Sequence, residues 1–184
     1  MPRPESDHAI AAALARLTAE LSPDLVYHSL AHTRDEVLPA VERLAYQEGV
    51  IDEPLLLLRT AAAYHDIGFV QQRHDHEQAS VAIARAMLPE FGYTPAHLAV
   101  IEGLIWATKL PQMPHTLPEQ ILADADLDSL GRLDFLSRSL ALRTELAASG
   151  TVIALPDWYA QQLAFVRQHR YFTPSARRLR DPGK

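Results

Sequence analysis

The chain contains no cysteine, and this absence excludes a disulfide framework and any metal site built on thiolates. Long apolar runs are also missing, since none approaches the roughly 18 residues that a membrane-spanning helix needs. The start, MPRPESDHAI, lacks the apolar segment of a signal peptide. Positive charge is scarce, and a net charge of −6 argues against nucleic acid as a partner. We therefore expect a cytoplasmic protein that binds neither nucleic acid nor membranes.

What is present fits one compact domain, because 184 residues with 48% hydrophobic content suffice to bury a core. Apolar residues recur at spacings of three and four, and no alternating strand pattern occurs. The sequence thus predicts an all-α, single-domain helical bundle over residues 1–184. Ser6 should cap the first helix, and Pro39 should kink the second. Later helices are expected over 53–66, 76–92, 94–108, 118–130, 132–148, 156–171 and 174–180, with a proline-rich loop over 109–118.

Polar residues interrupt three of these apolar helices. His32, the pair His65–Asp66, and Asp126 each fall on a face that should be buried. Unpaired polar groups cost roughly several kcal/mol in such positions. Each residue alone is common in proteins, but a shared cation would explain the burial of all of them together, because it offsets their desolvation.

The choice of aspartate in the segment QILADADLDSLG follows from the helical wheel. Asp126 lies four residues from Leu122 and from Leu130, so it sits on the apolar stripe. Asp124 and Asp128 fall on the opposite face and should be exposed or act as caps. Asp124 remains the alternative to Asp126 as a metal ligand.

The order H…HD…D on successive helices resembles the signature of the HD superfamily of metal-dependent phosphohydrolases. The motifs YHSLAHTRDEV, HDIGF, HEQAS, ATKLPQMP and DADLDSLGR are similar to a bacterial group of predicted HD phosphohydrolases. The resemblance runs from about Tyr27 to Arg178. It implies an HD core over about 27–131, on which helices over 132–180 pack. It also implies metal ligands at His32, His65, Asp66 and Asp126.

The sequence also departs from better-known relatives. The (p)ppGpp hydrolases carry an acidic pair after the HD dipeptide, where this chain reads IGFVQQ, and the cyclic-dinucleotide branch carries a lysine where Phe69 stands. Dinuclear relatives place a further histidine near IWATK. One metal per chain is therefore expected, although His76 with Glu77 could contribute to a second. Two imidazoles and two carboxylates favour Mn²⁺, Fe²⁺, Co²⁺, Ni²⁺ or Zn²⁺ over Mg²⁺.

Four further residues are candidate catalytic groups. His28, one helical turn from His32, could protonate the leaving oxygen or merely bond to backbone at the helix start. Lys109 could neutralise phosphate charge, with Arg73 as the next candidate, or could be an ordinary surface lysine. His76 and Glu77 open the fourth helix and could orient a ligand or act in catalysis.

These residues together predict a metal-dependent phosphohydrolase that cleaves a small phosphoester, such as a nucleotide, with water activated by the metal. Two other classes stay open. The same site could serve a regulatory module that senses a ligand without turnover, or it could hold redox iron as in the HD-type oxygenases. The partner would be a small phosphate compound, and a homo-oligomer is left open.

Overall fold

The computed structural model describes residues 4–184, and within that range it is helical without any strand. The all-α class expected from the apolar spacing is therefore confirmed. In chain order the helices are α1 (Ser6–Glu20), α2 (Leu38–Glu48), α3 (Asp52–Tyr64), α4 (His76–Met87), α5 (Pro95–Trp106), α6 (Leu117–Asp126), α7 (Phe135–Ala148), α8 (Leu155–Gln168) and α9 (Pro174–Arg180). None of the helices within 4–184 combines the length and the apolar character needed to span a bilayer.

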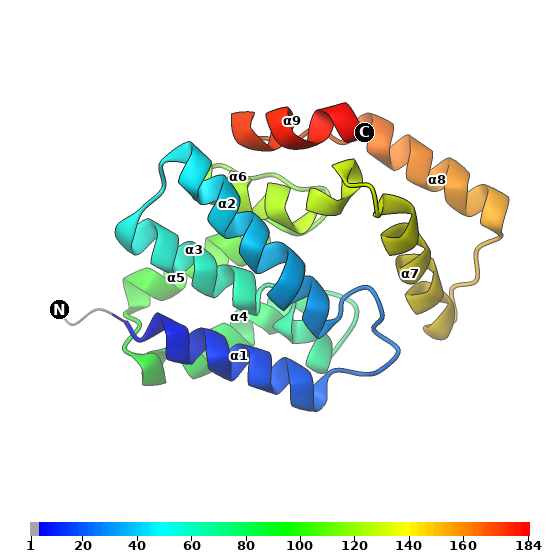
Figure 1. The fold of residues 1–184 in the computed structure, drawn as a ribbon. Coiled ribbons are helices and arrows are strands. Elements are labelled where there is room, and N and C mark those ends of the chain that lie inside the picture. The colour runs from blue at the N-terminus through cyan, green and yellow to red at the C-terminus, as the bar shows by residue number, and fades with distance from the viewer. Residues whose placement is uncertain (1–3) are drawn as a thin grey trace.

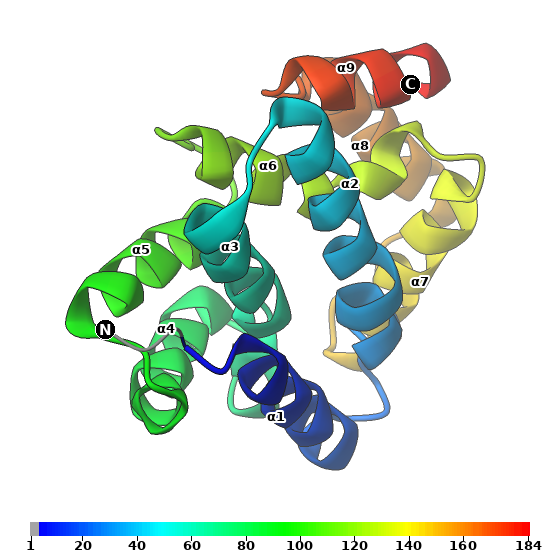
Figure 2. The ribbon, with the colours of Figure 1, turned by 60° about the vertical axis from the view of Figure 1, so that its left-hand side comes forward.

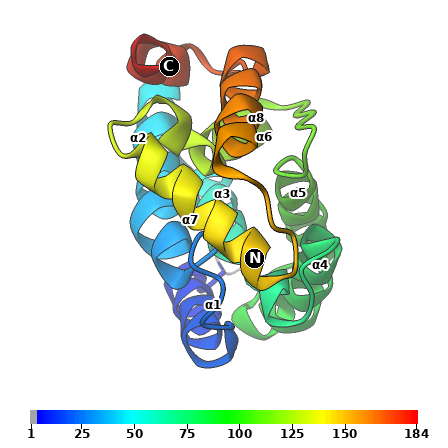
Figure 3. The same cartoon turned by 90° about the vertical axis from the view of Figure 1, so that its right-hand side faces the viewer.

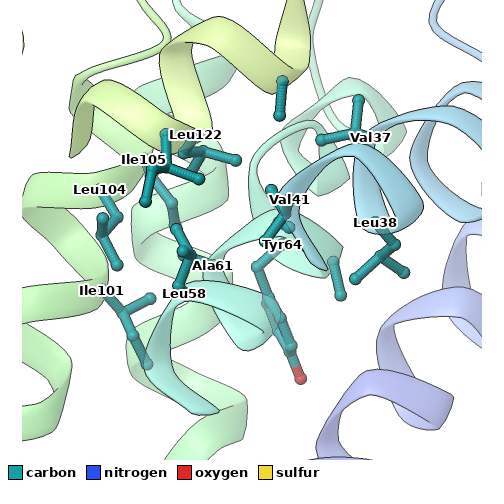
Figure 4. Packing of buried hydrophobic residues seen from close by; sticks show 14 of the residues in the cluster. Val37, Leu38, Val41, Leu58, Ala61, Tyr64, Ile101, Leu104, Ile105 and Leu122 are labelled. Atoms are coloured by element: carbon teal, nitrogen blue, oxygen red, sulfur yellow. The ribbon is translucent and has the colours of Figure 1, made fainter. Parts of the chain in front are cut away.

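Helix α3 lies at the centre of the bundle, where α1, α2 and α5 pack around it. Its sequence is apolar on nearly all sides, as expected for a central helix, and most of its residues are buried. Figure 4 shows side chains of α2, α5 and α6 meeting α3 around Leu58, Ala61 and Tyr64. The Tyr64 hydroxyl donates to the carbonyl of Ala9 in α1 (3.2 Å), so the central helix is also tied to the first one.

The ends of the molecule are formed by different parts of the chain. Helix α1 lies at one end and α9 at the other (Figures 1 and 2). Helices α7 and α8 form a pair at one side, which faces the viewer in Figure 3. Residues 107–116 join α5 to α6, in the region where the prolines predicted a loop over 109–118.

One prediction about a helix terminus was wrong. Glu5, not Ser6, precedes α1, and no side chain caps its first turn. At Pro39, where a kink was expected, the helix changes type: the six residues His32–Val37 form a π-helical stretch, η1, directly before α2. The amide of Leu38 donates to the carbonyl of Thr33, five residues earlier. Proline has no amide hydrogen to continue the regular ladder, and a wider turn is one way for a helix to accommodate this loss.

A second prediction failed in α6. The helix ends at Asp126, and a short 3-10 turn, η4 (Asp128–Gly131), follows where a continuous helix to residue 130 was expected. The chain returns after α8 to cover the far side of α6, with Tyr171 donating to the carbonyl of Leu127 (3.2 Å). This return places backbone against a face that the helical wheel assigned to solvent.

Candidate metal centre and adjoining cavity

The metal-type residues expected from the sequence come together at one place. His32 begins η1, His65 and Asp66 follow the last residue of α3, and Asp126 ends α6. Nε2 of His32 lies 3.1 Å from Oδ1 of Asp126 and 3.7 Å from Oδ2 of Asp66. Nε2 of His65 lies 3.3 Å from Oδ2 of Asp66 and 3.5 Å from Oδ1 of Asp126. Three segments far apart in the sequence thus converge on one small volume.

Both imidazoles present the same nitrogen to this volume. Nδ1 of His65 lies 2.7 Å from the carbonyl of Ala62, which can only accept, so Nδ1 carries the proton and Nε2 keeps its lone pair in the neutral ring. Nδ1 of His32 points to the Glu36 carboxylate at 3.4 Å, one helical turn away. A fixed Nδ1–H is the arrangement that orients a histidine as a metal ligand through Nε2.

Two buried atoms at this point have no hydrogen-bond partner. They are Nε2 of His65 and Oδ2 of Asp66, and the three residues His32, His65 and Asp66 offer ligand atoms that all lie within 4.8 Å of one another. Orphaned buried polar atoms are costly, and a cation between them would satisfy both. A nitrogen and oxygen donor set without sulfur fits a divalent transition ion.

Opposite charges stabilise each other at this point. Burial opposes the ionised form of Asp66, but the neighbouring His65 and His76 outweigh it and hold the pKa of this carboxyl well below its usual range. Burial likewise opposes ionisation of Asp126, while His32 and His65 lower its pKa to about 2. Burial lowers the pKa of His32, but Asp126 and Glu36 raise it to about 9. Without a metal the carboxylates thus favour protonated imidazoles, and a divalent cation would bind in place of those protons.

The other two aspartates of this segment do not lie where the wheel placed them. Asp124 is fully buried rather than exposed, and it accepts hydrogen bonds from the amides of Phe172 and Thr173 (both 2.8 Å) and from the Thr173 hydroxyl (2.7 Å). Asp128 is also buried, and Arg180 binds both of its oxygens at 2.7 Å. The returning C-terminal segment covers both residues. Asp124 thus points away from the histidines, and only Asp126 joins them.

His76 and Glu77 reach the cluster from the start of α4. Nε2 of His76 lies 3.4 Å from Oδ1 of Asp66, which is the oxygen not shared with His65, and 3.7 Å from Glu77. Gly68 permits this approach, because a Cβ at that position would lie 2.0 Å from the carbonyl of His76. The Phe69 ring stacks on the His76 ring at 4.0 Å between centroids and fixes its plane.

His28 also stacks on the Phe69 ring, with centroids 4.3 Å apart, and its ring centroid lies 6.0 Å from that of His76. Its Nδ1 is 2.5 Å from Oε1 of Glu145 in α7, and Oε2 of Glu145 accepts from the amides of Tyr27 and His28. The alternative in which the His28 ring bonds to backbone at the helix start is therefore wrong, because its hydrogen-bond partner is the distant carboxylate of Glu145.

Lys109 and Arg73 both line the cavity beside the cluster. Nζ of Lys109 is paired with Oδ1 of Asp75 at 2.7 Å, and both side chains are largely exposed. Within residues 4–184 no carboxylate pairs with Arg73. Lys109, the first candidate to bind phosphate, is thus already paired with Asp75, whereas Arg73, the alternative, is not paired with a carboxylate in the part of the chain that the structure describes.

The cluster forms part of the wall of a cavity of about 630 Å³. Asp66, Asp126, His28 and His76 line its polar side. Residues of α7 and α8 line the same cavity, and both helices face the viewer in Figure 3. A volume of this size accommodates a small organic molecule.

Three residues that position side chains of the candidate site were not predicted from the sequence. Glu36 could have been found, because it follows His32 at the i+4 spacing that places two side chains on one helix face. The sequence offered weaker support for Glu145, which is a carboxylate among the apolar residues of α7. Arg138, which lies 3.3 Å from Glu36 and donates to the carbonyl of Tyr27, had none, because its partners are about a hundred residues away.

Comparison with known proteins gives one match. The family model of the HD domain matches residues 9–129, which is more than half of the 184 residues. Neither the curated proteins nor the solved structures include a significant match. The matched range contains His32, His65, Asp66 and Asp126 and ends just before α7. The chain belongs to the HD domain family, as its H…HD…D order indicated.

Proposed function

We propose that this protein is a metal-dependent phosphohydrolase that cleaves a small phosphoester. The observation that carries this proposal is the pair of partnerless buried atoms, Nε2 of His65 and Oδ2 of Asp66, next to a cavity that Asp66 and Asp126 line and that is wide enough for an organic phosphate. The HD family supports it, because its members are mostly metal-dependent hydrolases. Nucleotides and related small phosphates are the substrates expected from the sequence.

In this proposal His32, His65, Asp66 and Asp126 hold one divalent ion, which would be Mn²⁺, Fe²⁺, Co²⁺, Ni²⁺ or Zn²⁺ rather than Mg²⁺. Such an ion, when bound, lowers the pKa of water and polarises a phosphoryl oxygen. Glu36 orients His32, and the carbonyl of Ala62 orients His65.

The remaining polar residues act on the substrate. Hydrolysis adds water to phosphorus and breaks the bond to the ester oxygen, which must receive a proton as it leaves. His28 supplies that proton, since Glu145 engages its Nδ1 and leaves Nε2 for the reaction. His76, held by Phe69 and beside Asp66, fixes that carboxylate, and Glu77 supports His76. Arg73 and Lys109 balance the charge of the phosphate.

The first experiment measures metal content and phosphate release on the same preparations. Purified protein should contain roughly one transition metal per chain, and it should release phosphate from a panel of nucleotides and sugar phosphates with Mn²⁺ or Co²⁺ better than with Mg²⁺. Asp66→Ala should lose the metal and melt at a lower temperature, because a bound ion stabilises the folded state. Asp24→Ala, an exposed aspartate, is the matched control.

The outcomes separate the rival functions. Absence of metal, together with an unchanged melting temperature in Asp66→Ala, would refute the metal centre. Bound metal without phosphate release from any compound would favour the regulatory module. Bound iron whose absorption spectrum changes on exposure to oxygen and substrate would favour the oxygenase.

A further inference from the structure

The cavity extends well beyond the metal-type residues. Its far side, here named the apolar chamber, is lined by Leu130, Phe135, Leu142, Leu146, Trp158 and Phe165. Most of these belong to α7 and α8, outside the residues that match the HD family model. The chamber and the metal centre are parts of one continuous space, so one ligand can occupy both.

Helix α7 buries little of its apolar surface. Ser139 and Glu145 are its only buried residues. Phe135 packs against the core while also lining the cavity, and Leu142 and Leu146, which line the cavity too, stay half-exposed. Apolar surface turned toward an internal space gains free energy when an apolar group covers it. A helix with this pattern offers its apolar face to a ligand.

Polar recognition groups are scarce in the chamber. The indole N–H of Trp158 donates to the Ser139 hydroxyl at 2.9 Å, and the Ser149 hydroxyl donates to the carbonyl of Leu146 at 2.8 Å. The remaining amide is that of Gln162, and Thr151, which also lines the cavity, is exposed. A nucleobase or a sugar carries several donors and acceptors, which would be buried there without partners at a cost.

We propose that the substrate is a phosphate monoester of an apolar alcohol or phenol, with its phosphate at the metal centre and its organic group in the apolar chamber. This inference rests on the proposed function and narrows its substrate class away from nucleotides. The reaction consumes one water, breaks the bond between phosphorus and the ester oxygen, and gives inorganic phosphate and the apolar alcohol. The proton on that alcohol comes from His28.

Binding can be measured without turnover. Alkylphosphonates from methyl to hexyl carry a P–C bond that cannot be hydrolysed in this way. Trp106→Phe leaves Trp158, in the chamber wall, as the remaining tryptophan and hence as the fluorescent reporter. The affinity of the metal-loaded protein should rise by up to about fourfold per added CH₂ group until the chamber is full. The value of kcat/KM for alkyl phosphates should rise in parallel and should exceed that for adenosine monophosphate.

Two variants of α7 test whether the apolar chamber causes the dependence of affinity on chain length. Leu142→Asn should flatten the dependence on chain length while methylphosphonate binds as before. Leu136→Asn changes an exposed leucine of the same helix and should leave the dependence intact. Melting curves of both variants show whether each is folded.

The results distinguish this inference from the proposal on which it rests. If methyl and hexyl phosphates are hydrolysed with equal kcat/KM, or adenosine monophosphate is preferred, the substrate class is wrong and the phosphohydrolase stands. If hexylphosphonate binds far more tightly than methylphosphonate but no phosphate ester is hydrolysed, the ligand class stands and the hydrolase is refuted.

Discussion

Glu145 and His28 are 117 residues apart in the sequence, yet Oε1 of the carboxylate lies 2.5 Å from Nδ1 of the imidazole. The other carboxylate oxygen accepts from the backbone amides of Tyr27 and His28 at 2.8 and 3.0 Å. Burial raises the pKa of Glu145, but its hydrogen bonds with His28 outweigh that effect and lower it. An ionised Glu145 therefore sets both the position and the ring orientation of His28.

The first prediction concerns proton transfer to the leaving group. His28→Gln should lower kcat on an alkyl phosphate roughly 10²- to 10⁴-fold, the range typical of a lost general acid. The loss on 4-nitrophenyl phosphate should be much smaller, because that leaving group needs no proton. Glu145→Gln should show the same dependence on leaving group with a smaller loss, since Glu145 only positions His28. Equal losses on both substrates would indicate a structural role for the pair.

The second prediction separates Asp126 from Asp124. Asp126→Asn should weaken metal binding at least roughly tenfold, because it removes a charged donor beside both histidines. Asp124→Asn should leave metal affinity unchanged but cost about 1–3 kcal/mol of stability, since the new amide would face the donors of Phe172 and Thr173. Metal titration and chemical denaturation of both variants give the answer. A larger metal defect in Asp124→Asn would contradict the assignment.

The third prediction compares the two cations that line the cavity. Arg73→Ala should lower turnover of a phosphate monoester roughly ten- to a thousandfold at subsaturating substrate, as expected for a lost electrostatic stabiliser. Lys109→Ala should have a smaller effect, because Asp75 already pairs with Nζ. Metal content and melting temperature should stay constant in both. The exposed Arg178→Ala is the control. A larger loss in Lys109→Ala would mean that the substrate displaces Asp75.

The fourth prediction concerns acid stability. Burial and the nearby Lys184 and Arg170 lower the pKa of His169 to about 4, against the opposing effect of Asp181. The unfolded chain, with an ordinary histidine pKa near ~6.5, then binds a proton more readily than the folded one between those values. Stability should therefore fall as the pH drops from about 6.5 to about 4.

His169→Gln removes that contribution. Its melting temperature should fall less than that of the parent between pH 7.5 and pH 5, whereas His115→Gln, at an exposed position, should follow the parent. Parallel curves for His169→Gln and the parent would show that protonation of His169 does not control the acid transition.

Local pattern was sufficient for the helical class and for the approximate helix ranges, though not for every helix terminus, and it singled out four residues that the structure brings together. Apolar spacing marks the buried face of a helix, and His32, His65, Asp66 and Asp126 stood out because they are polar on such faces. The same reasoning failed for Asp124, because a helical wheel takes account only of residues in the same helix. Whether the opposite face meets water depends on the segment around Thr173, about fifty residues later, which no local pattern specifies.

The groups that support the site show the same limit. Glu36 lies within one turn of His32, so its spacing carries information about their contact. Glu145 and Arg138 lie on a helix whose docking onto the loop before His32 depends on the whole fold. The cavity in front of the site depends on that docking as well, so the sequence did not reveal the apolar chamber.

The wide turn η1 has a consequence for tolerated changes in chain length. An i→i+5 turn holds one residue more than a regular turn, and a residue of regular helix corresponds to about 100° of rotation. The wide turn η1 therefore takes up one residue without rotating His32 relative to α2. Deleting one residue from 33–36 would let the helix close into regular geometry with His32 still facing His65 and with Val41 and Leu44 still in the core. Closing the turn with all of its residues retained would instead rotate His32 by about 100°, away from His65. The direction in which His32 faces thus depends on the shape of this turn as well as on the residues in it.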